Sequence, residues 1–456
     1  MRLNVRQVLV VTILLVASAA ILWADNLSLT VYNSNLGVVR EVRKLDFMQG
    51  NGRIAFADVP SQIDATSVTL EMTDPKLAVE ILEQNYAYDL VSPDKIYGKY
   101  IDHEIEVITE KGELFSGTLL SFSGGYLVIR QSDGKIRSIV QGTVRDVTFP
   151  DLPEGLITRP TLFWLYNSSF AGSADAVVSY QTSGIAWQAE YIGVLGVDEK
   201  MLNLTGWVSI DNHSGKTYND ATLKVIAGDI HRVQRETPVY RADMEMAMTA
   251  MPKAAAGFEE KPFFEYHLYT LPRPATIADN EIKQISMFDP AQAAVAKEFR
   301  YTADPGQTDV MVYIKTTNTK EVGLGMPLPA GRVRVFKADT DGSMILLGED
   351  RIDHTPRNEE IKLTIGQAFD IVGKTTMMAQ RRLSDKASET DVSLEVRNQK
   401  ETPVTVVVSK SLGGYWEITQ STVDFVKKSA TEVEWKLDIP AAGKGVVDFT
   451  VRNTWP

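Results

Sequence analysis

The residues with the clearest potential for nucleophilic chemistry lie in one short stretch near the middle of the chain. Asp211, His213, Ser214 and Asp220 supply carboxylates, a base and a hydroxyl within ten residues. A hydrolase with a serine nucleophile requires the serine hydroxyl within hydrogen-bonding reach of its histidine base. His213 and Ser214 are adjacent, and adjacent residues of an extended strand point to opposite faces. We therefore interpret this stretch as a turn, with a second strand beginning near Ala221. The chain also has no Gly-x-Ser-x-Gly elbow.

Metal-binding patterns are weak apart from one methionine cluster. The five histidines are scattered, without the i, i+4 spacing of a helical zinc motif. Asp339 begins a sequence similar to a calcium loop, but Met344 stands where that loop requires glycine, which favours a hairpin turn. Soft thioethers select Cu(I), so a copper site is one hypothesis and a linker without metal is the other. The candidate ligands are Met244, Met246, Met248 and Met251.

Aromatic residues supply one candidate ligand-binding position. Tyr415 and Trp416 follow the Gly413-Gly414 pair, and an exposed aromatic face at a flexible turn can stack on a sugar ring. Most other tryptophans lie in strand-like runs, where such side chains usually fill a core. These residues are Trp164, Trp187, Trp207 and Trp435.

The composition excludes several classes of protein. The 456 residues include 47 Lys and Arg, 59 Asp and Glu, and no Cys, which gives a formal charge of −12. A nucleic-acid-binding protein requires clustered positive charge, so we expect no nucleic-acid partner. Without thiols there is no disulfide framework, no Cys-ligated metal and no Cys nucleophile. We expect no cofactor.

The first 24 residues have the pattern of an export signal. Arg2 and Arg6 precede a charge-free, mostly apolar run from residue 7 to residue 24, which ends in small residues. This pattern predicts a cleaved signal peptide over residues 1–24 and a periplasmic or otherwise exported protein. The alternative is an uncleaved signal anchor, because the run approaches the length that spans a bilayer. No later segment has a comparable run, so we predict no further membrane span.

The dominant hydrophobic period along the chain is two, which predicts β-strands with one buried face. Clear examples are residues 27–32, 391–397 and 433–439. Turn signals such as Asn-Gly and Asp-Gly separate these runs. The sequence therefore predicts an all-β protein with two antiparallel, sandwich-like domains. A helix beginning near Asp289 is a weaker alternative to the strands predicted there.

We expect the following organisation. Residues 25–96 form an N-terminal β region. Residues 97–150 form five short strands, which predicts a small closed barrel of the SH3 or Sm-like kind inserted in the N-terminal half. Residues 151–231 form a β region that pairs with the N-terminal or the C-terminal sheet. Residues 232–262, rich in Met and Ala, read as a flexible linker, and residues 263–456 as a C-terminal β-sandwich.

Several long stretches resemble one bacterial family, the domain of unknown function 4139, which includes mucoidy inhibitor A-like proteins. They are LTVYNSNLGVVREVR from Leu29, EQNYAYDLVS from Glu83, ITRPTLFWLYN from Ile157, SYQTSGIAWQAEYIGVL from Ser179, LTGWVSIDNHSGKTYNDATLKVIAGDI from Leu204 and EYHLYTLPRPATIADNEIKQISMF from Glu265. The resemblance implies an exported, mostly β protein. It supplies no catalytic residues, and many relatives lack a segment like residues 97–150.

The sequence favours an exported, non-catalytic envelope protein that acts through contacts with a protein or a glycan. The first alternative is a periplasmic hydrolase that uses carboxylates, although 59 acidic residues offer no unique pair. The second alternative is Cu(I) handling by the methionine cluster.

Overall fold

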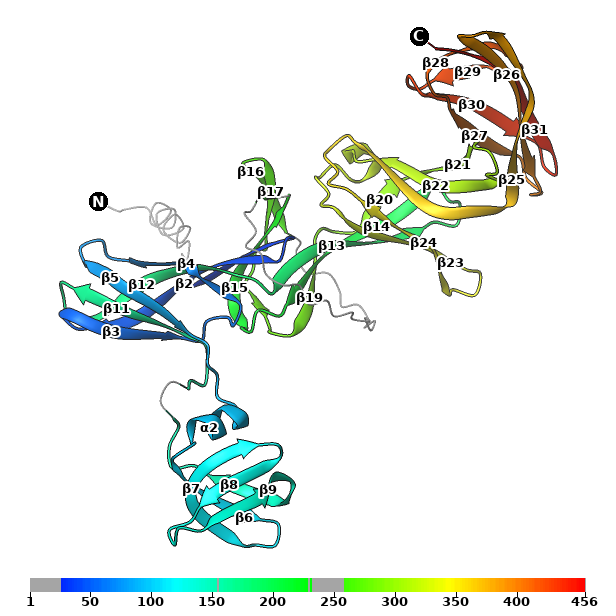
Figure 1. The fold of residues 1–456 in the computed structure, drawn as a ribbon. Helices are drawn as coiled ribbons and strands as arrows, with labels where there is room; N and C mark the ends of the chain where they lie inside the picture. The colour runs from blue at the N-terminus through cyan, green and yellow to red at the C-terminus, as the bar shows by residue number, and fades with distance from the viewer. Residues whose placement is uncertain (1–25, 154–155, 229, 232–257, 456) are drawn as a thin grey trace, which may run out of the picture.

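A computed structural model describes residues 26–153, 156–228, 230–231 and 258–455. The described chain is almost entirely β-structure arranged in five sheets, as the sequence predicts (Figure 1). The helix proposed near Asp289 does not form, because strands β20 (Ala291–Ala294) and β21 (Ala296–Thr302) occupy that stretch. No helix in these described ranges is both long and apolar enough to cross a bilayer.

The N-terminal part contains two sheets. The first has the order β16-β17-β15-β1-β2-β12-β4, with β18 also paired to β15, and the second has the order β3-β11-β5. Their strands are β1 (Leu27–Tyr32), β2 (Leu36–Phe47), β3 (Gly50–Ala57), β4 (Ile63–Met72), β5 (Val79–Ala87), β11 (Thr161–Ser168), β12 (Gly172–Thr182), β15 (Tyr218–Ala227), β16 (Glu259–Phe263), β17 (Tyr266–Thr270) and β18 (Ala275–Ile277).

A third sheet lies at the centre of the chain and a fourth at its C-terminal end. The central sheet has the order β19-β14-β13-β23-β24, with β20 also paired to β14. Its strands are β13 (Ile185–Leu195), β14 (Met201–Asn212), β19 (Glu281–Ser286), β20, β23 (Gly331–Ala338) and β24 (Met344–Ile352). The C-terminal sheet contains β21, β22 (Asp309–Thr317), β25 (Glu360–Ser384), β26 (Ala387–Asn398), β27 (Val404–Ser411), β28 (Tyr415–Ser421), β29 (Phe425–Lys427), β30 (Glu432–Ile439) and β31 (Lys444–Thr454).

The fifth sheet is the small unit predicted for residues 97–150, and its five strands form as expected. They are β6 (Glu104–Thr109), β7 (Leu114–Ser123), β8 (Tyr126–Arg130), β9 (Ile136–Val140) and β10 (Val144–Thr148), in the order β10-β6-β7-β8-β9. The expected barrel closure is wrong. The 3₁₀ turn η1 (Gln141–Thr143) sends β10 to the far edge, so β9 and β10 do not pair. A short helix, α2 (Pro93–Lys99), precedes the unit (Figure 1).

Three separate hydrophobic cores organise these sheets. The largest joins the N-terminal and central sheets and includes Ile314, Ile361 and Leu363 of β22 and β25. The second lies within the C-terminal sheet and the third within the small unit. Residues 151–231 pair with both neighbours, because β12 and β15 join the N-terminal sheet whereas β13 and β14 join the central one. Residues 263–456 are divided among three sheets, because β17 and β18 join the N-terminal sheet and the later strands join the central and C-terminal sheets. Strand β16 falls inside the range assigned to the linker, and residues 232–257 lie outside the described residues.

The three larger sheets are mixed, which corrects the expectation of purely antiparallel pairing, whereas β3-β11-β5 and the sheet of the small unit are antiparallel. The hairpins β1–β2, β13–β14, β21–β22 and β25–β26 are antiparallel. Each of the last three hairpins is followed by a strand that skips this hairpin. That strand pairs in parallel with the first strand of the hairpin one earlier in the order given. These parallel pairs are β15 with β1, β23 with β13, and β27 with β21. Successive hairpins are therefore interlocked through one strand each.

A fully buried asparagine stands at each of these three crossovers. Asn212, Asn318 and Asn398 are all 0% exposed. Each Nδ2 donates to backbone carbonyls on both sides of the crossover, and each Oδ1 accepts a backbone N–H. The carbonyl partners include Lys216 and Ala278 for Asn212, Met326 and Pro356 for Asn318, and Thr402 and Pro440 for Asn398. The amides replace the ladder bonds that the turning chain gives up.

We predict that Asn398→Ala destabilises the C-terminal sheet by about 1–3 kcal/mol, because it removes a fully buried amide that donates to the carbonyls of Thr402 and Pro440 in two part-buried hydrogen bonds. Hydrogen exchange measured by mass spectrometry should show faster exchange in β26 and β27. Asn85→Ala, at an exposed position of β5, is the control and should leave exchange unchanged. Unaltered protection of β26 and β27 would refute the role given to Asn398.

Glu199, at the turn of the β13–β14 hairpin, predicts a dependence of stability on pH. Its carboxylate accepts hydrogen bonds from Lys297 on β21 and Lys337 on β23, which lower its pKa from 4.5 to about 2. The stabilisation is complete above pH 4.5 and is lost as the pH falls towards 2. Because the carboxylate is about a third exposed, we expect about 1 kcal/mol after solvent screening. Urea unfolding of Glu199→Gln should differ from wild type at pH 7 and converge with it near pH 2.

Candidate functional site

Four connections between strands meet beside the end of β14. The amide N–H of Gly184 donates to Asn35 Oδ1 at 2.8 Å, and that of His213 donates to the carbonyl of Gly184 at 2.6 Å. Gln62 Nε2 donates to the carbonyl of His213, also at 2.6 Å. The β1–β2, β3–β4, β12–β13 and β14–β15 connections are therefore joined by direct hydrogen bonds. This loop cluster contains the sequence segment with the most polar chemistry.

The hydroxyl and the base proposed for nucleophilic chemistry, Ser214 and His213, do not come together. The stretch after Asn212 is a turn, as predicted, and Ser214 is buried whereas His213 is exposed. Ser214 Oγ bonds Asn212 Oδ1 at 2.8 Å and lies 3.1 Å from Tyr218 Oη. The His213 ring instead contacts Asn280 Oδ1 at 3.1 Å and Asp211 Oδ1 at 2.9 Å. Ser214 consequently has no histidine base.

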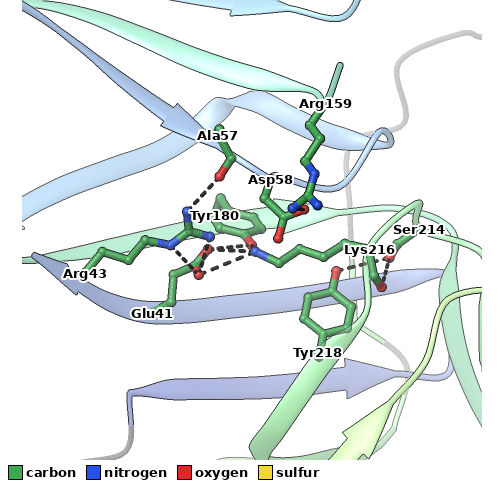
Figure 2. Close-up of polar contacts among 9 residues, drawn as sticks. All are labelled: Glu41, Arg43, Ala57, Asp58, Arg159, Tyr180, Ser214, Lys216 and Tyr218. Carbon is green, nitrogen blue, oxygen red and sulfur yellow. Dashed lines mark hydrogen bonds and ion pairs between the residues drawn. The ribbon is translucent and has the colours of Figure 1, made fainter. Parts of the chain in front are cut away.

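Beneath this turn lies a buried ion cluster that the sequence did not reveal. Figure 2 shows Lys216 extending away from Ser214 towards β2, where its Nζ lies 3.1 Å from Glu41 Oε1 and 3.3 Å from Tyr180 Oη. Arg43 Nη2 lies 2.8 Å from Glu41 Oε2, and Tyr180 Oη donates to Glu41 Oε1 at 2.9 Å. Glu41 and Lys216 are 6% and 7% exposed. Two cations and a phenol therefore surround one buried carboxylate.

The cluster of Glu41, Arg43, Tyr180 and Lys216 has a structural role, and we call it the lock. Burial lowers the pKa of Lys216, although the Glu41 carboxylate opposes the shift. A buried lysine can act as a base or form a Schiff base, but this Nζ contacts Glu41 and Tyr180, and Lys216 does not line either of the cavities of about 510 and 400 Å³ in the described chain. Burial and the adjacent Glu41 raise the pKa of Tyr180, so its hydroxyl stays protonated and donates. The cluster ties β2, β12 and the β14–β15 connection together.

On the outer side of the same loop cluster lies a cavity of about 510 Å³, which we call the cavity below. This volume is within the range of small-ligand sites. Ala186, Trp187, Ile282, Pro329 and Ala330 supply its apolar part. Its main polar side chains are Asn33, Gln188, Ser209, Asp211, Arg351 and His354. They come from the β1–β2 turn and from β13, β14 and the end of β24.

The register of the central sheet explains why these polar residues share one face. Asp211 pairs with Ala186, Ser209 with Gln188, and Trp207 with Glu190. Glu190 pairs with Arg332, which pairs with Arg351. Paired residues project to the same side of a sheet, so one face of β14-β13-β23-β24 is polar. The opposite face, including Val208 and Tyr191, enters the largest core.

Three buried polar side-chain atoms of the described chain accept or donate no hydrogen bond, and all belong to this region. They are Asn33 Oδ1, Asp211 Oδ1 and Trp207 Nε1. His213 Nε2 lies close to Asp211 Oδ1 without the alignment of a hydrogen bond. Buried polar atoms are nearly always satisfied, and exceptions are often sites where a ligand or ion supplies the missing partner.

Donors lie at the other end of the cavity. Arg351 on β24 is exposed, and no ion pair of its guanidinium appears among the described residues. The backbone N–H of Ala330 donates to His354 Nδ1 at 3.1 Å, so a neutral His354 ring carries its proton on Nε2 and can donate from there. In contrast, Arg332 is held by Glu190, with Nη2 to Oε1 at 3.0 Å.

The other sequence-based candidates have separate outcomes. Tyr415 is 72% exposed, but Trp416 is half-buried against the C-terminal core, and its Nε1 donates to the carbonyl of Ala430 at 2.6 Å. Trp416 therefore offers less ring surface than expected. Of the predicted core tryptophans, Trp207 is only half-buried, whereas Trp164, Trp187 and Trp435 are buried.

The calcium-like loop at Asp339 and the Cu(I) site of the methionine cluster also have different outcomes. Asp339 belongs to a hairpin turn, as predicted, with its N–H donating to the carbonyl of Ser343. No group of three or more His, Asp or Glu residues that could hold a metal occurs in the described part of the chain. The proposed Cu(I) ligands Met244, Met246, Met248 and Met251 lie outside the described residues.

We predict that Glu41→Gln destabilises the fold by about 3–5 kcal/mol, because it leaves the Lys216 ammonium buried without its counter-charge. Lys216→Met should cost less, since Arg43 still neutralises Glu41. Thermal unfolding followed by circular dichroism measures both effects. Asp133→Asn, which removes a surface pair with Lys135, is the control and should change little. Equal melting temperatures for Glu41→Gln and wild type would contradict the lock.

The chain was also compared with known proteins. No family model matches it, and no curated protein matches it.

Proposed function

We propose that this protein is an exported envelope protein that acts by binding, with the cavity on the polar face of the central sheet as its ligand contact. The observation that carries this proposal is the convergence, in a cavity of about 510 Å³, of polar atoms without hydrogen bonds and of Arg351, which has no ion pair within the described ranges. The export-signal pattern of residues 1–24 supports a location outside the cytoplasm. Membership of the family named above, and sandwich-like packing around the two larger cores, are part of the same proposal.

The arrangement of side chains favours binding over hydrolysis. A carboxylate-dependent glycoside hydrolase requires two carboxyl groups that flank the scissile bond. Asp211 is the single carboxylate lining this cavity in the described chain, and the Ser214 hydroxyl is committed to Asn212 and Tyr218. Polar groups that are fixed in place without a reactive pair suit recognition of a ligand that leaves unchanged. The Cu(I) hypothesis stays a separate prediction for the methionine cluster.

The test is a ligand screen with the purified mature chain. A panel of short peptides and envelope oligosaccharides should include at least one class that raises the melting temperature and is recovered intact by mass spectrometry. A ligand at 100 times its Kd stabilises by about 2.7 kcal/mol. Ala330→Trp should abolish the shift, because the indole fills the cavity.

Ala338→Trp is the matched control, since Ala338 is exposed at the far end of β23, which begins directly after Ala330, and does not line the cavity. It should bind like wild type. A shift that survives Ala330→Trp would contradict the assigned location, and conversion of the ligand by wild type would contradict a purely binding role.

A further inference from the structure

We infer that the cavity recognises a short extended peptide with both ends free, its ammonium group at Asp211 and its carboxylate at Arg351. This inference deepens the proposed function and rests on it, because it names the ligand class for the same cavity. It follows from the separation of charge along the cavity, from its length and from the polar atoms left without partners.

The two ends of the cavity carry opposite chemistry. At one end are acceptors, namely the Asp211 carboxylate and Asn33 Oδ1, and no aligned hydrogen bond satisfies either Asp211 Oδ1 or Asn33 Oδ1. An ammonium group offers three donors and a positive charge, which complements this set. At the other end are donors, namely the Arg351 guanidinium and His354 Nε2. A guanidinium binds a carboxylate through two parallel hydrogen bonds.

The sheet sets the distance between these ends. Asp211 lies on β14 and Arg351 on β24, with β13 and β23 between them. Three strand spacings of about 4.8 Å place the two strands about 14 Å apart. Arg351 is in line with Trp207, four residues from Asp211, which adds an offset of about 13 Å along the strands and gives a diagonal of about 20 Å between the two positions. A free amino acid is too short to reach both charges. An extended peptide rises about 3.3 Å per residue, so roughly six residues match this span.

The middle of the cavity has groups that suit a peptide backbone. Gln188 Nε2 donates to Glu190 Oε1 at 2.9 Å, which leaves the Gln188 amide oxygen as an acceptor for a backbone N–H. Ile282 is 46% exposed beside Asp211 and provides apolar surface for a side chain. A neutral oligosaccharide would use the same hydrogen-bonding groups but would carry no charge for Asp211 or Arg351. The peptide is therefore the ligand class that the charges favour.

The test uses hexa-L-alanine with free ends as the probe, and isothermal titration calorimetry at pH 7.5 as the measurement. We expect N-acetylation of the peptide, and separately C-terminal amidation, each to weaken binding to wild type at least tenfold. Trp207 lies on the same sheet face as Asp211, and its indole N–H makes no hydrogen bond to the described residues. The fluorescence of this indole should therefore change when the peptide binds.

Two variants that each remove one charge test which end of the peptide lies at Asp211 and which lies at Arg351. Asp211→Asn should bind the free and acetylated peptides with similar affinity while keeping its preference for a free carboxylate, and Arg351→Gln should show the reverse. Asp424→Asn and Arg382→Gln remove exposed charges in the C-terminal part of the chain and should bind like wild type. Melting temperatures check that each variant is folded, and the comparison of blocked peptides on wild type requires no variant.

The outcomes separate the two proposals. Equal binding of free and blocked hexa-alanine by wild type would overturn the peptide inference. If tri-N-acetylchitotriose binds instead, and Ala330→Trp abolishes that binding, the peptide inference fails and the proposed binding function stands. If neither the peptide nor any oligosaccharide of the panel binds, both fail.

Discussion

The side-chain amide of Asn212 holds the connection on which both polar sites depend. Its Nδ2 donates to the carbonyls of Lys216 and Ala278, and its Oδ1 accepts from the N–H and the hydroxyl of Ser214. With the turn fixed in this way, Lys216 points inward to Glu41 while Asp211, the residue before the asparagine, faces the cavity. One buried amide thus orients a lysine and an aspartate towards opposite sides of the loop.

The same device recurs wherever the chain passes a strand back to an earlier hairpin. Asn318 and Asn398 stand at the other two parallel crossovers and also bond carbonyls on both sides of them. Parallel pairing joins residues that are distant in sequence, so its loop-closure entropy is large. A buried amide with several backbone partners at each crossover offsets part of that cost. The hairpins are linked by exchanged strands and by these amides together.

The two polar sites differ in how completely their groups are paired. Around Glu41, the charges of Lys216 and Arg43 and the hydroxyl of Tyr180 satisfy the carboxylate, and the low exposure of the group makes that pairing strong. Around Asp211, acceptors and donors are separated by the width of the sheet and cannot satisfy one another. Complete pairing gives rigidity, whereas incomplete pairing leaves the hydrogen-bonding capacity that recognition of a ligand requires.

The sequence by itself determined the strands, because side chains alternate with a period of two and glycine-containing turns separate them locally. It also determined the turn after Asn212, since short polar side chains there bond their own backbone. Helix α2 was missed although Ser92, Pro93 and Asp94 form a recognisable helix start. Only the tertiary structure decided the parallel pairings, the open edge of the small sheet, and the meeting of Glu41 with Lys216 or of Asn33 with Arg351 in one cavity. The physical reason is that these contacts join residues far apart in the chain, and neither periodicity nor local turn chemistry specifies which strand edges meet.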